Sequence, residues 1–272
     1  MNGKAMVWSV RRELWENRSI YIAPLAVGAV IVLGSIAVAF AGRHQRPDQV
    51  AQQYEIAGGA VMAAALLVAI FYCLDALYGE RRDRSVLFWK SMPVSDLDVV
   101  LSKMAVPIVV LPVVTFAIIL ATQLVMLLTT SVVLLMLGHS PATSWHLPWL
   151  QMSLGLLHHL VTVHSLYYAP IFGWLLLVSA WAKRLPFLWA FLPLAAIGFI
   201  EKIVFNTTHF AAMLGSRLSG GMEGPEAKNG VMMMWPGNPL AFMARPGLWI
   251  GFAIAAACIA GAVQLRRYRD PI

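Results

Sequence analysis

Between Lys103 and Lys183 the sequence contains no Asp, Glu, Lys or Arg. This uncharged run, 104–182, is 79 residues long, whereas one membrane-spanning helix needs about 20 apolar residues. Over the whole chain 12% of residues are charged, about half of the ~25% found in soluble domains, which excludes a water-soluble fold. The sequence therefore indicates a membrane protein that crosses the bilayer more than once.

Other signals are also missing. The two cysteines, Cys73 and Cys258, both lie inside apolar runs, which indicates neither a disulfide framework nor a metal site. No G-x-x-x-x-G-K-[ST] motif is present, so the chain lacks the phosphate-binding loop of an ATPase. The net charge of +7 does not indicate nucleic-acid binding, because the basic residues cluster between apolar runs, as they do when they set membrane orientation.

Apolar runs are what the sequence has in quantity, since 60% of its residues are hydrophobic. We expect one all-α membrane domain over residues 1–272, with six transmembrane helices. The expected spans are 20–41, 57–78, 104–130, 155–182, 186–205 and 248–265.

The basic residues predict the orientation of these spans. If the segments between spans alternate sides, one side holds 14 of the 20 Lys and Arg residues. By the positive-inside rule that side is cytoplasmic, and it includes both termini. The expected location is a bacterial inner membrane, crossed several times.

The segment before the first span has the pattern of an amphipathic helix. Val7, Val10 and Leu14 form an apolar stripe, and Trp8 and Trp15 lie seven residues apart beside it. We expect an interfacial "elbow" helix, with its tryptophans at headgroup depth and its basic residues facing anionic membrane lipid.

A two-part loop follows the second span. A dense charge cluster begins at Glu80 and leads into the apolar stretch 86–89, after which Pro93 interrupts the chain. Ser95 has the position of an N-cap, and Asp96 begins the following helix, where acidic groups favour the positive end of the helix dipole. The pattern predicts a short helix lying across the membrane face.

This loop, together with six spans, an elbow helix and cytoplasmic termini, resembles the permeases of ABC-2 type ABC exporters, and the resemblance covers most of the chain. Glu80, Arg81, Pro93 and Ser95 match the family's recurring positions, whereas Arg84-Ser85 stands where many members have Gly-Thr. The resemblance implies an ATPase-coupling role for Glu80, Arg81, Arg84, Val86, Phe88, Trp89, Pro93 and Ser95.

The same resemblance implies a permease subunit and not an enzyme, with no catalytic residues, metal or cofactor of its own. Two copies of a cytoplasmic ABC ATPase would bind ATP and Mg²⁺, and a second permease would complete a homodimer. Substrate would move outward from the cytoplasm or the inner leaflet. Small residues such as Gly28 and Gly34 are expected at the dimer contact, where helices approach closely.

Three other features leave alternatives open. His158, His159 and His164 suit either a membrane-embedded redox or metal enzyme or polar helix packing and cavity lining, and no carboxylate accompanies them in the uncharged run. The methionines 232–234 suit either a soft-metal site or an interfacial segment. Asp75, an acidic residue inside a span, would either pair with a cation or line the substrate pathway. A non-transporting membrane scaffold is a further alternative.

Overall fold

A computed structural model describes residues 3–41, 47–83, 95–138, 140, 142–145, 149–220 and 242–268. Every regular element within these ranges is a helix, so the described part of the chain is all-α, as expected. The elements are α1 (Gly3–Glu16), α2 (Ser19–Phe40), α3 (Pro47–Ala76), α4 (Tyr78–Arg82), α6 (Asp96–Ala105), η1 (Val106–Val110), α7 (Leu111–Met136), α8 (Ala142–Trp145), α9 (Trp149–His159), η2 (Leu160–Tyr167), α10 (Ala169–Trp181), α11 (Pro186–Phe205), α12 (His209–Leu218) and α14 (Pro246–Tyr268).

Five helical stretches of the described chain are long and apolar enough to cross a membrane. They are Ser19–Phe40, Val50–Arg82, Asp96–Met136, Pro186–Phe205 and Pro246–Tyr268. A sixth is added if Trp149–Tyr167 and Ala169–Trp181, which meet at a bend of 46°, count as one span. These helices are consistent with the multi-pass character expected from the apolar runs.

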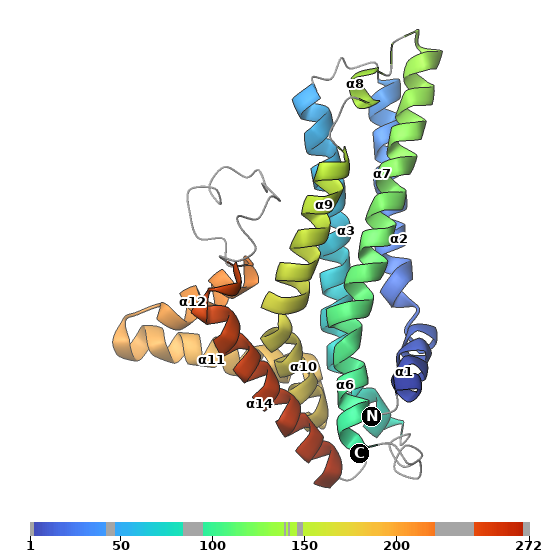
Figure 1. The fold of residues 1–272 in the computed structure, drawn as a ribbon. Coiled ribbons are helices and arrows are strands. Elements are labelled where there is room, and N and C mark those ends of the chain that lie inside the picture. Colours follow the sequence, from blue (N-terminus) through green and yellow to red (C-terminus); the bar gives the residue numbers. More distant parts are fainter. Residues whose placement is uncertain are drawn as a thin grey trace.

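The helices form an upright bundle with a side extension (Figure 1). Helices α2, α3, α7 and α9 stand side by side, and α10 packs along α14 below the bend. Helix α1 lies at the base, against α6 and near the end of α14. Helices α11 and α12 project to one side, and α11 runs across the direction of α7.

Small residues allow α10 and α14 to pack closely. A Cβ atom added at Gly173 would lie 3.2 Å from the Cα of Ala255, so the two backbones nearly touch. Phe172 and Leu176 of α10 and Leu248 of α14 are fully buried in the same core. Close approach of this kind is how apolar helices gain packing energy where no water is available to drive their association.

Two helices extend well beyond the expected spans. Helix α3 begins ten residues before position 57, and the stretch Asp96–Met136 is 41 residues long. At 1.5 Å per residue that stretch measures roughly 60 Å, about twice the hydrocarbon thickness of a bilayer. The expected boundaries were too narrow because hydropathy marks where a helix meets hydrocarbon, and polar residues such as Gln52 and Gln53 continue the helix outside it.

The α11–α12 hairpin is held by a carboxylate that the sequence analysis did not single out. Glu201, inside the expected fifth span, accepts hydrogen bonds from the backbone N–H groups of His209 and Phe210 at 2.7 and 2.9 Å. It also accepts one from the hydroxyl of Thr207 at 2.8 Å. Glu201 therefore satisfies the free N–H groups at the start of α12 from the preceding helix.

The two glycines expected at a dimer contact have different surroundings. A Cβ atom at Gly28 would lie 2.6 Å from Thr122 Oγ1, because α2 packs against α7 of the same chain there. The expectation that Gly28 faces a partner is therefore wrong: a small residue permits close approach to any helix, and here the neighbour is internal. At Gly34 an added Cβ meets nothing within 4 Å.

Replacing each of these glycines by leucine should have different effects on stability, because their surroundings differ. Gly28→Leu forces a branched side chain into the α2–α7 contact and should destabilise the protein by about 1–3 kcal/mol. Gly34→Leu, the matched control on the same helix, should change stability by less than ~0.5 kcal/mol. Thermal unfolding in detergent measures both, and equal losses for the two variants would contradict the internal role of Gly28.

Candidate coupling site

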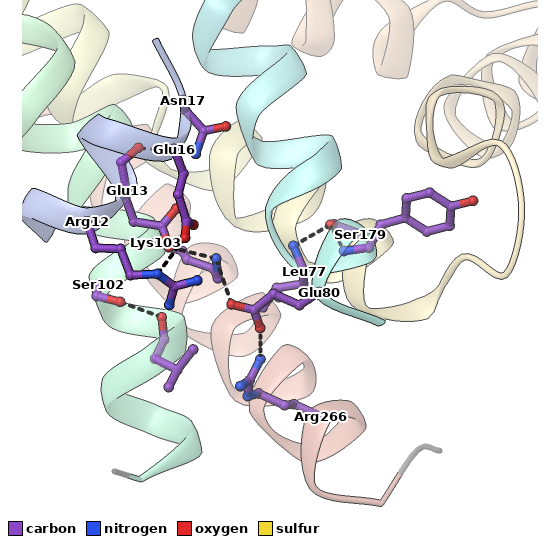
Figure 2. Close-up of polar contacts among 12 residues, drawn as sticks. Arg12, Glu13, Glu16, Asn17, Leu77, Glu80, Ser102, Lys103, Ser179 and Arg266 are labelled. Carbon is purple, nitrogen blue, oxygen red and sulfur yellow. Dashed lines mark hydrogen bonds and ion pairs between the residues drawn. The ribbon is translucent and has the colours of Figure 1, made fainter. Parts of the chain in front are cut away.

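The candidate site lies at the base of the bundle, where four helices that are distant in sequence meet (Figure 2). Helix α4 ends here at Arg82 and α6 begins here at Asp96, so both helices that flank the segment 84–94 are part of the site. Helix α1 and the last turn of α14 complete the site. We call the five charged side chains that join these helices the base network: Glu13, Glu80, Asp96, Lys103 and Arg266.

Lys103 is the first cation of the base network. Its Nζ lies 2.9 Å from Glu13 Oε1 and 3.0 Å from Glu80 Oε1 (Figure 2). The three side chains are at most 9% exposed, so water contributes little to their solvation. One ammonium group therefore joins α1 to α4.

Arg266 is the second cation, and it contacts both helices that flank the segment 84–94. Its Nη1 forms a short ion pair with Glu80 Oε2 on α4. Its Nε donates to Asp96 Oδ1 on α6 at 3.1 Å. A planar guanidinium has donors on two edges, which suits it to hold two carboxylates at once. The helices on either side of the segment are thus paired with the same residue of α14.

Arg81 and Ser179 tie the same region to α10. Nη2 of Arg81 donates to the carbonyls of Ser179 and Ala182 at 2.9 and 2.5 Å. The hydroxyl oxygen of Ser179 accepts from the backbone N–H groups of Leu77 and Tyr78 at 3.0 and 2.9 Å. These two N–H groups bond to α10 at the point where α3 ends and α4 begins, which locates the break between the two helices.

The charges of the base network depend on one another. Each buried ion loses several kcal/mol of hydration, and this loss is offset only when every charge has close, well-oriented partners. Glu13 gains a further donor, the hydroxyl of the buried Tyr72, at 2.9 Å from its Oε2. Removal of one member would leave its partner buried and uncompensated, so the arrangement favours a rigid junction and not a set of independent surface pairs.

The structure describes three of the eight predicted coupling residues. Glu80 and Arg81 are both buried in the site. Ser95 caps α6 as expected: its hydroxyl oxygen accepts from the backbone N–H of Asp98 at 3.1 Å. The remaining five lie outside the described residues: Arg84, Val86, Phe88, Trp89 and Pro93. Asp75 is exposed on α3, close enough to Arg82 for an electrostatic interaction.

Several members of the site were not singled out from the sequence. In the sequence, Lys103 and Arg266 were counted only among the basic residues of the cytoplasmic side. Glu13 was only one of the polar residues of the expected elbow helix. One available signal is that Lys103 directly precedes the long uncharged run, where a cation must find a carboxylate or reach water. Only the tertiary structure shows which carboxylates Lys103 meets.

The histidines lie elsewhere, in the middle of the bundle. The rings of His159 and His164 are 5.5 Å apart, and His164 is 5.4 Å from the ring of Tyr168. Among the described residues no group of three or more His, Cys, Asp or Glu side chains is arranged to hold a metal ion. The methionines 232–234 lie outside those residues.

Comparison with known proteins gives no relative: no family model, curated protein or solved structure matches this chain.

Neighbouring glutamates on α1 provide a matched test of the base network. Glu13 is buried against Lys103, whereas Glu16 pairs with Arg12 at 35–51% side-chain exposure. Glu13→Gln should lower the free energy of unfolding by about 3 kcal/mol, because it leaves Lys103 with one carboxylate in a buried site. Glu16→Gln should cost less than ~1 kcal/mol, as exposed pairs do. Unfolding in mixed micelles measures both, and similar costs would refute a buried network.

Proposed function

We propose that this chain is the permease subunit of an ATP-driven exporter of the ABC-2 type. In this proposal it crosses a bacterial inner membrane six times, with both termini in the cytoplasm and α1 lying in the interface as the elbow helix. It would pair with a second copy of itself and with two ATPase subunits, which bind ATP and Mg²⁺. Substrate would pass outward through the paired permeases.

The observation that carries the proposal is the pairing of Arg266 with both helices that flank the segment 84–94. A coupling element has to pass a displacement from an ATPase to the spans without absorbing it. The helices α4 and α6, which flank the segment, share a guanidinium on α14, and through Lys103 they also share an ammonium with α1. A push on the segment would therefore move all four helices together.

The continuation of these helices into the bundle supports the same function. Helix α6 runs through η1 into α7, and α14 packs along the length of α10. A rotation at the base would reach the bend between η2 and α10, which lies inside the bundle. Rigid-body movement of helices about such a bend is a common way in which transporters open to alternate sides.

The apolar side chains of the segment would provide the contact with the ATPase. Phe88 and Trp89 are the aromatic residues of the stretch, and buried aromatic anchors carry much of the energy of protein interfaces. In this proposal the segment binds the ATPase, and the base network passes the displacement from the segment to the helices.

The test uses the full chain purified from its native membranes with an affinity tag. We expect an ATPase with a Walker motif to co-purify, and Phe88→Ala with Trp89→Ala to release it or to uncouple ATP hydrolysis from export, with membrane insertion intact. The matched control replaces Trp249 and Ile250 by Ala, an adjacent and exposed apolar pair at the other end of α14. It should retain both assembly and export.

Two results would contradict the proposal. Unaltered assembly and export in the Phe88 and Trp89 double variant would remove the segment from coupling. Failure of any Walker-motif protein to co-purify from membranes that export substrate through this chain would exclude the permease of an ATP-driven exporter.

A further inference from the structure

A small cavity lies inside the bundle where its two π-helical segments, η1 and η2, come into contact. Its volume is about 10 Å³. That is close to the smallest space that holds one water molecule, provided that polar partners line it. The lining residues are contributed by α3, η1, α7, η2 and α10, so the cavity is at the meeting point of most of the bundle.

The first polar group in the lining is the hydroxyl of Thr115, which is fully buried and has no hydrogen-bond partner. Other helical hydroxyls of this protein avoid that situation. Ser131, Thr162 and Ser165 each donate to a carbonyl four or five residues earlier, at 2.7 to 3.2 Å. A buried hydroxyl without a partner loses its hydrogen bonds to water and gains none within the protein. The unpaired hydroxyl of Thr115 therefore requires an explanation.

The second polar group is the imidazole of His164. Its Nδ1 is buried without a hydrogen-bond partner. When the neutral ring carries its proton on Nε2, Nδ1 is an acceptor that needs a donor. His164 and Thr115 line the same cavity, so the two unmet groups belong to side chains that share one small space.

Two prolines, Pro107 and Pro112, also line the cavity. In η1 the N–H of Leu111 bonds to the carbonyl of Val106, five residues earlier. Pro112 has no N–H, so it cannot donate the next hydrogen bond of this series.

We propose that one ordered water molecule binds in this cavity and joins η1 to η2. It donates to Nδ1 of His164 and accepts from the hydroxyl of Thr115. A water is suited to the site because it supplies a donor and an acceptor within one small volume. This inference is independent of the transport function, since it concerns only the polar groups inside the bundle.

The test is solid-state NMR of the full chain, labelled with ¹⁵N-histidine, in lipid vesicles. In the unaltered protein we expect magnetisation transfer from water to the His164 ring and a ¹⁵Nδ1 shift typical of a hydrogen-bonded acceptor. Thr115→Val, which removes the hydroxyl at nearly constant volume, should abolish the transfer and move the Nδ1 signal. Thr115→Ser, which keeps the hydroxyl, should preserve both.

Thr162→Val is the matched control, because the Thr162 hydroxyl donates to the carbonyl of His158 in the same span and does not line the cavity. It should leave the His164 signals unchanged. Absence of water transfer to His164 in the unaltered protein would overturn the proposal, whatever the variants do. A Thr115→Val protein that melts at a higher temperature with an unchanged Nδ1 shift would also overturn it, since that is the behaviour of a dry cavity.

Discussion

The buried carboxylate of Glu80 sets the constraint on which the base of this protein depends. Its two oxygens bind different cations, Lys103 on α6 and Arg266 on α14. A carboxylate that is at most 9% exposed cannot stay ionised in an apolar protein without such partners, and each cation brings a further acid with it, Glu13 or Asp96. Four helices, from α1 near the start of the chain to α14 near its end, are therefore held at one point.

Above this junction the uncharged run 104–182 has no charge with which to specify its packing. It relies on shape: Gly28 admits Thr122 of the run, and Gly173 admits the backbone of Ala255. Several hydroxyls of the run bond within their own helix. The molecule thus has a charged, tightly paired base and an apolar upper bundle. This division suits the proposed function, in which force enters at the base and helices move above it.

The sequence was most informative where its signal is local or compositional. Apolar runs predicted the helices, and the Ser95 N-cap with the acidic first turn predicted the start of α6 to the residue. Glu80 and Arg81 were selected by resemblance and lie in the site. Arg266 was visible only as a cytoplasmic charge, because nothing in the sequence states which of the carboxylates a distant cation will meet.

The errors have physical causes of the same kind. Helix α3 and the stretch Asp96–Met136 continue past the predicted spans, because hydropathy measures contact with hydrocarbon and not hydrogen bonding along the backbone. Gly28 was assigned to a partner chain because a small residue shows that something approaches, without showing what. Glu201 was overlooked inside an apolar span, although a carboxylate there can cap a neighbouring helix as well as line a pathway.

The most direct test of a single, interdependent base network is a thermodynamic cycle on Lys103. Lys103→Met is made in the unaltered protein and in a background that carries Glu13→Gln and Glu80→Gln, and the free energy of unfolding is measured in mixed micelles. If the network acts as one unit, Lys103→Met should be less destabilising in the neutral background by about 1–3 kcal/mol, because the acids that it compensates are gone. An equal cost in both backgrounds, within about 0.5 kcal/mol, would show that these charges are independent and would contradict a rigid junction at the base.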